Sequence, residues 1–126
     1  MPKKVVCHEI PIEFGDHIVY LISTNTQVSA DAYIKRKFKV TIDHKPSPEE
    51  AGAYFAGSMN QLFLYLPPKL GLEYLVHEIV HMYKYMVTRM GTDPDEEGEA
   101  YIKQMLFKKI VDKLIEVKLV MISYSD

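Results

Sequence analysis

The hydrophobic positions in the first third of the chain predict one strand and one short helix. Residues 17–23 read His-Ile-Val-Tyr-Leu-Ile-Ser, a β-branched and aromatic run bounded by turn-forming residues, which is typical of a strand. Apolar side chains then recur at helical spacing through residues 30–38. We expect a helix there, with Ser29 as its N-cap.

The middle of the chain predicts a β-hairpin. Residues 53–56 and 61–66 are apolar runs of strand length, and residues 57–60 between them suit a four-residue loop. Residues 39–43 predict a further brief strand. The two prolines within residues 44–48 interrupt regular structure, because each removes a backbone N–H donor.

The second half of the chain predicts two long helices. Residues 70–90 are mostly apolar and contain no proline, and Gly91 is a typical C-terminal stop. Asp93 precedes a proline, and Glu96 follows three residues after it, which is the pattern of an N-cap with Pro94 at the first helical position. This second helix should end near residue 117.

Together these elements predict an α+β fold. We expect a small, mostly antiparallel sheet of three or four strands that covers one side of the first long helix, with the second long helix following it. The length of 126 residues suits a single domain, residues 1–126, with one core and one site.

Composition and charge narrow the function. The 15 basic and 17 acidic residues give a net charge of −2, which provides no strong field for nucleic acid or anionic lipid, so we expect neither as a partner. Cys7 is the only cysteine, so any metal must be bound by histidines and carboxylates. The N-terminal apolar stretch is too short for a signal peptide, and no apolar run reaches the about 20 residues that span a bilayer, so we expect a cytoplasmic protein.

The pattern His-Glu-x-x-His at residues 77–81 lies inside the first long helix. One helical turn separates His77 from His81, so their Cβ atoms should lie about 5–6 Å apart and both imidazoles can reach one tetrahedral zinc. Glu78 is rotated by about 100° from His77, which places its carboxylate beside the metal. There it can accept a proton from a zinc-bound water and return it to a leaving amine.

A catalytic zinc usually has three protein ligands, so the next helix should supply the third. Glu99 heads a stripe of apolar residues on that helix and is therefore expected to point inward, where a carboxylate needs a partner or a metal. We predict Glu99 as the ligand. Glu96, Glu97 and Asp95 remain alternatives.

These residues give the chain a resemblance to a known family. The His77-Glu78-Ile79-Val80-His81 motif, followed by Glu99-Ala100-Tyr101, resembles the gluzincin branch of the zincin metallopeptidases. More narrowly, residues 50–115 look like small phage-encoded metallopeptidase-like proteins. The resemblance implies Zn²⁺ bound by the two histidines and the glutamate, and a strand beside the cleft that pairs with an extended peptide, for which residues 61–66 are the candidate.

The chain departs from the gluzincin pattern at two points. Larger gluzincins often place an aspartate four residues after the ligating glutamate, where this chain has Lys103. They also carry a second lobe with a His or Tyr that stabilises the oxyanion, and this sequence has no such segment after the second helix. Tyr101, Tyr54 or Tyr65 could take that role, and the sequence does not choose among them.

The sequence thus predicts a zinc metallopeptidase that acts on a peptide or protein substrate, with Glu78 as general base and His77, His81 and Glu99 as metal ligands. The alternative is a catalytically silent domain that zinc stabilises and that binds a protein partner, because zinc alone can hold a small fold together. The catalytic glutamate favours the hydrolase, since a purely structural zinc site has no use for a base at that position.

Overall fold

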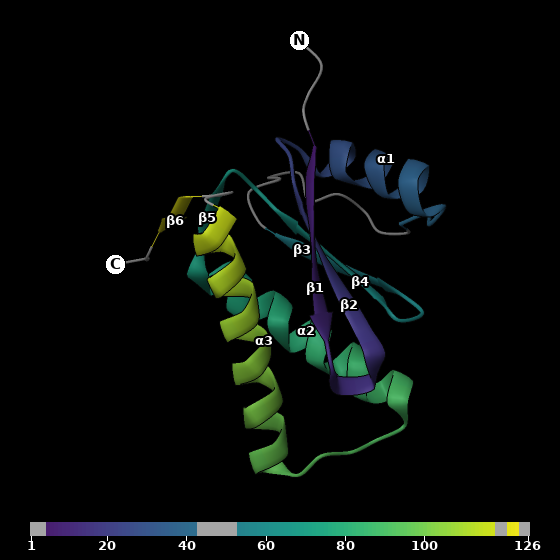
Figure 1. The fold of residues 1–126 in the computed structure, drawn as a ribbon, viewed down its shortest axis with the longest axis vertical. Coiled ribbons are helices and arrows are strands. Elements are labelled where there is room, and N and C mark those ends of the chain that lie inside the picture. The colour runs from purple at the N-terminus through teal and green to yellow at the C-terminus, as the bar shows by residue number, and fades with distance from the viewer. Residues whose placement is uncertain (1–4, 43–52, 118–120, 124–126) are drawn as a thin grey trace.

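A computed structural model describes residues 5–42, 53–117 and, for the backbone, 121–123. Within these residues four strands form one sheet in the order β1-β2-β4-β3 (Figure 1). The strands are β1 (Val6–Ile12), β2 (His17–Ser23), β3 (Tyr54–Ser58) and β4 (Gln61–Leu66). The predicted α+β class is confirmed. The sheet is mixed, because β1/β2 and β3/β4 are antiparallel whereas β2/β4 is parallel.

The N-terminal half of the sheet contains a strand that the sequence did not predict. β2 has the predicted bounds, whereas β1 pairs with it over its whole length, from Val6 opposite Ser23 to Ile12 opposite His17. A short 3₁₀ turn, η1 (Phe14–Asp16), joins the two strands, and Gly15 there adopts a φ of 71° that favours glycine. Pro11 is tolerated in β1 because this strand forms one edge of the sheet.

The predicted hairpin is confirmed, with a tighter turn than expected. Ser58 pairs with Gln61, so the loop contains only Met59 and Asn60 and not the four residues 57–60. Met59 has a φ of 53°, in the left-handed region that favours glycine. The hairpin side of the sheet therefore carries a strained non-glycine residue at its tip.

The first helix begins earlier than predicted. α1 (Gln27–Phe38) is capped by Thr26, whose hydroxyl oxygen accepts the N–H of Ser29 at 3.1 Å, so Ser29 is not the N-cap. Lys39 takes a left-handed φ of 61° and ends the helix. Residues 39–42 form no strand, so the strand predicted at 39–43 is wrong over that range. Residue 43 and the proline-containing stretch 44–48 lie outside the described residues.

The two long helices are confirmed, with changes at both N-termini. α2 (Leu72–Met90) ends at Gly91 as predicted, with a φ of 67°, but residues 69–71 form the short strand β5 (Lys69–Gly71), which pairs in parallel with β6 (Met121–Ser123). α3 (Glu96–Val117) follows.

The N-cap of α3 is Asp95 and not Asp93. The Asp95 carboxylate accepts the N–H of Gly98 at 2.7 Å, and its carbonyl accepts the N–H of Glu99 at 2.9 Å. Pro94 therefore precedes the cap and is not the first helical residue, and Glu96 is not in the predicted capping-box position.

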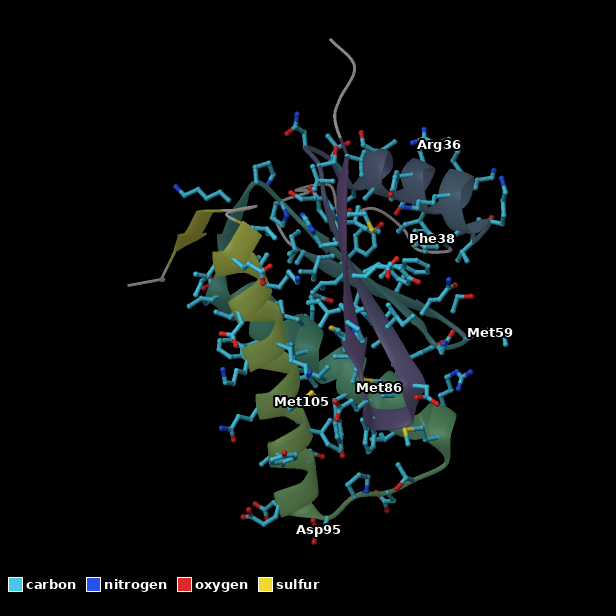
Figure 2. The ribbon with its side chains drawn as sticks, viewed as in Figure 1. Arg36, Phe38, Met59, Met86, Asp95 and Met105 are labelled. Carbon is cyan, nitrogen blue, oxygen red and sulfur yellow. The ribbon has the colours of Figure 1, made fainter. Side chains whose placement is uncertain are left out.

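Helices cover both faces of the sheet. α2 and α3 pack on one face against alternating residues of β1, β2 and β4, while α1 packs on the other face over an aromatic cluster that includes Tyr20, Phe38 and Phe63. In Figure 1, α2 crosses behind the strands and α3 runs beside them, and Figure 2 shows Met86 and Met105 between the helices and the sheet. The predicted apolar stripe of α3 is buried at Ile102, Leu106, Ile110 and Leu114.

The described helices were also compared with the requirements of a membrane span. Within residues 5–42 and 53–117, none combines the length and the apolarity that would let it cross a membrane.

Candidate metal and substrate site

Helix α2 brings the two histidines of the motif together. His77 and His81 are one turn apart on its exposed side, and their Nε2 atoms lie 3.1 Å from each other. Zinc binds imidazole nitrogen at about 2.0–2.1 Å, so two ligands of one tetrahedral ion lie about 3.3 Å apart. The two nitrogens thus converge to nearly the separation that a shared zinc requires.

Glu78 is buried near the two histidines, on the side of α2 that faces β3. Its residue is only 8% exposed, and its carboxylate accepts the backbone N–H of Phe55 on β3. Burial raises the pKa of Glu78, while the neighbouring imidazoles and the Phe55 N–H act in the opposite direction. A carboxylate with a raised pKa beside two imidazoles is suited to proton transfer.

The structure does not bring Glu99 to the histidines. Its Oε2 atom accepts a hydrogen bond from Nζ of Lys103 at 2.9 Å, and its side chain is 46% exposed. Lys103 also lies over the ring of Tyr83, whose pKa is raised by burial and by the Glu99 carboxylate. Glu99 thus faces α2 only in part: its carboxylate lies near the buried Tyr83, but it pairs with Lys103 from the next turn of α3 and stays half-exposed.

The alternative carboxylates do not complete the site either. Asp95 caps α3, and Glu96 and Glu97 are exposed in its first turn. Within residues 5–42 and 53–117, no group of three or more His, Cys, Asp and Glu side chains is arranged to hold a metal ion. The two histidines fit a zinc ion, and Glu99 as the third ligand stays a prediction that requires its carboxylate to exchange Lys103 for the metal.

The strand beside the site is β3 and not the predicted one. Residues 61–66 form β4, which lies between β2 and β3, so it cannot accept a peptide as an additional strand. Because a two-residue turn makes Ser58 and Gln61 a hydrogen-bonded pair, the N–H and C=O groups of Phe55 and Gly57 point away from β4. The acceptance of the Phe55 N–H by Glu78 agrees with this register.

An open cleft of about 720 Å³ lies between β3 and α2. The β3 hairpin and α2 both line this cleft. The hairpin contributes Tyr54, Phe55 and Met59, and α2 contributes Glu78, His81, Lys84, Tyr85, Thr88 and Arg89. Figure 2 shows Met59 at the hairpin tip, projecting outward from the body of the molecule. Glu78 and His81 thus share one cleft with β3, the outer strand of the sheet among the described residues.

Tyr85 forms the wall of this cleft. Its ring packs edge-on against Phe55 with 5.5 Å between the ring centroids, and its hydroxyl donates to the carbonyl of Met59 at 2.8 Å. The same ring lies over Gly57, where an added Cβ would meet it at 2.5 Å. A glycine at this point in β3 lets the helix approach the strand.

The three tyrosines named from the sequence do not offer a free hydroxyl to this cleft. Tyr65 is fully buried and donates to the carbonyl of Thr24, and the hydroxyl of Tyr54 donates to Asp31. Tyr101 is 71% exposed on α3 and lines other surface grooves. Tyr54 therefore lines the cleft with a hydroxyl that is already bonded to Asp31, and Tyr65 and Tyr101 do not line it.

Sequence reasoning missed several cleft residues. Met59 was expected only as part of a loop, and Tyr85, Lys84 and Arg89 were not singled out from the sequence. A signal was present, because residues 78, 81, 85 and 89 follow one another at steps of three and four on α2 and so share a face with the motif. The continuous apolar run of β4 is likewise typical of a central strand and not of an edge.

Comparisons with known proteins add no relative. No family model, no curated protein and no solved structure matches this chain. The likeness to gluzincins therefore depends on the motif residues and their geometry alone.

Proposed function

We propose that this protein is a zinc-dependent peptidase in which His77 and His81 bind the metal and Glu78 is the general base. The observation that carries the proposal is the combination of the 3.1 Å approach of the two imidazole nitrogens with a buried carboxylate from the same helix. A histidine pair without a chemical role would have no need of a buried carboxylate near it, since burying a charge is costly.

Bound zinc would polarise the scissile carbonyl and lower the pKa of a coordinated water. Glu78 would then accept a proton from that water and pass it to the leaving amine. Its position beside β3 favours this role, because a peptide that pairs with the outward-pointing backbone groups of Gly57 and with the Phe55 carbonyl would pass directly beside it.

The proposed third ligand is Glu99. Its present partner Lys103 is part of a half-exposed ion pair, and such pairs contribute only about 0–1 kcal/mol. The free energy of binding a zinc ion that already has two imidazole ligands would be several times larger than the free energy lost with this ion pair. Breaking the Glu99–Lys103 ion pair so that Glu99 can bind zinc therefore costs little free energy.

One observation favours the alternative of a zinc-stabilised binding domain. Val76 and Val80 flank His77 on α2 and are 51% and 45% exposed, and with Phe107 of α3 they line an apolar groove. Exposed apolar surface of this kind is typical of contact sites. In this second reading zinc would fix α2 and the groove would bind a protein partner.

Two measurements test the proposal. Zinc content and affinity are compared for the wild type, His81→Ala and Glu99→Ala, with Glu97→Ala as the matched control from the same exposed turn. One tight zinc per chain, lost in His81→Ala and weakened at least about tenfold in Glu99→Ala but not in the control, is expected. Unchanged affinity in Glu99→Ala would remove it as a ligand, and an absence of zinc in the folded wild type would refute the metal site.

Hydrolysis is tested with a broad peptide library. Cleavage that a chelator and Glu78→Gln both abolish, with zinc still bound in that variant, is the expected result. A folded protein that binds zinc and cleaves no peptide would favour the binding domain instead.

A further inference from the structure

The cleft has an uneven distribution of charge. Lys84 and Arg89 line it from α2, and among the described residues of its lining Glu78 is the only acidic one. Within the described part of the chain, neither cation has a carboxylate oxygen within 4.0 Å, although Lys103, Lys108 and Lys113 all do. Two exposed cations therefore face an open cleft with no acidic partner among residues 5–42 and 53–117.

One of these cations has an explanation within the helix itself. Arg89 lies in the last turn of α2, where a positive side chain interacts favourably with the helix dipole. Lys84 lies more than a turn before the end of the helix, where that effect has faded. The dipole thus accounts for Arg89 alone and leaves the position of Lys84 in the cleft unexplained.

Both cations lie at a defined distance from the proposed base. At a rise of about 1.5 Å per residue, Lys84 and Arg89 are about 9 and about 16 Å beyond Glu78 along α2. A peptide extended along β3 advances about 3.3 Å per residue. The cations therefore meet a peptide about three to five residues from the bond that lies beside Glu78.

The hairpin tip supplies an apolar wall at this same end of the cleft. Met59 lines the cleft and is 72% exposed, yet its backbone φ of 53° disfavours a side chain. Tyr85 holds this conformation through its hydrogen bond to the Met59 carbonyl. An exposed methionine kept in a strained turn is an observation that points to a use for its side chain.

We infer that this end of the cleft is a carboxylate subsite, formed by Lys84 and Arg89 with Met59 and Tyr85 as its apolar wall. The register of the subsite relative to the scissile bond rests on the proposed function, whereas the carboxylate preference itself does not. The ligand is a peptide carrying a carboxylate on an apolar stem, three to five residues from the cleavage point. The carboxylate is either an acidic side chain or the C-terminal group of the peptide.

Peptide binding tests the inference without requiring turnover. All proteins carry Glu78→Gln, so that no bound peptide is consumed, and dissociation constants are measured by fluorescence anisotropy. The probes are eight-residue peptides with one Glu and an amidated C-terminus, the Gln counterpart with an amidated C-terminus, and the same Gln peptide with a free C-terminus. The test protein is the double variant Lys84→Gln/Arg89→Gln. The matched control is the double variant Lys35→Gln/Arg36→Gln on α1, which covers the opposite face of the sheet.

We expect one carboxylate-bearing peptide to bind about fivefold more tightly than the amidated Gln peptide, the ratio expected for one exposed ion pair of about 1 kcal/mol. The ratio should fall to about one in Lys84→Gln with Arg89→Gln and persist in the control. Preference for the Glu peptide identifies a side-chain subsite, and preference for the free C-terminus identifies a terminal one.

Equal binding of all three peptides, a preference that survives the loss of Lys84 and Arg89, or no binding up to millimolar concentration would each overturn the inference. The two proposals fail separately. A carboxylate preference without hydrolysis in the wild type leaves a peptide-binding cleft and refutes the peptidase, whereas hydrolysis without the preference refutes only the subsite.

Discussion

Replacement of Gly57 by alanine should reveal how closely α2 approaches the edge strand. A Cβ at this position would lie 2.5, 2.6 and 2.8 Å from three ring atoms of Tyr85. Non-bonded carbons prefer about 3.5–4.0 Å, so the ring must move by about 1 Å. That movement strains the packing and breaks the 2.8 Å hydrogen bond to Met59.

The change combines two destabilising contributions with one stabilising contribution. Overpacking costs about 1–3 kcal/mol and the lost hydrogen bond about 1 kcal/mol. Alanine returns about 0.4–1 kcal/mol by restricting the unfolded chain, because the φ of Gly57 is not in the left-handed region. We therefore expect Gly57→Ala to lower the free energy of unfolding by about 2 kcal/mol.

A double-mutant cycle isolates the contact. In a Tyr85→Ala background the ring is absent, so Gly57→Ala should stabilise the protein slightly, and the sign of its effect should reverse. Urea unfolding of the wild type, the two single variants and the double variant gives the coupling energy. A change in unfolding free energy that is the same in both backgrounds, within the about 0.5 kcal/mol expected of independent sites, would refute the contact.

Three further predictions concern stability. Met59→Gly should raise the free energy of unfolding by about 1 kcal/mol in thermal denaturation, because it relieves the left-handed backbone, and no gain would mean that the turn is unstrained. Asp95→Ala should lower it by about 1 kcal/mol through loss of the N-cap while Asp93→Ala changes little, and the reverse order would move the cap to Asp93. In zinc-free protein, Glu78→Gln should raise it by about 1 kcal/mol, since the amide oxygen can still accept the Phe55 N–H without a buried charge; a destabilised variant would contradict that cost.

The features that the sequence predicted well depend on local signals. β2 has its predicted bounds because a β-branched run is limited by turn residues on both sides, and α2 ends at Gly91 because the left-handed C-terminal position favours glycine. The convergence of His77 and His81 follows from helix geometry alone. None of these features requires knowledge of what lies across the core.

The features that the sequence did not predict depend on distant partners. β1 shows little alternation and contains a proline, so its pairing with β2 becomes visible only in the sheet. The role of Phe55 is a backbone contact, which leaves no trace in its residue type. The position of Glu99 depends on how far α3 is rotated about its own axis, and the i+4 lysine that binds its carboxylate competes with any metal.

The caps illustrate a narrower failure. Thr26 and Ser29 are both good capping residues, and so are Asp93 and Asp95. The sequence alone offers two candidates three or two residues apart, and the backbone hydrogen bonds that start each helix decide between them.

The pairing of β5 with β6 has a mechanical consequence for the two long helices. The pairing holds the chain immediately before Leu72 next to the chain shortly after Val117. The N-terminal end of α2 and the C-terminal end of α3 are therefore held together. Glu99 lies near the other end, 18 residues from Val117, which is about 27 Å along α3. Glu99 therefore lies at the end of α3 that β5 and β6 do not hold, where its position depends on the packing of α3 against α2 and β1.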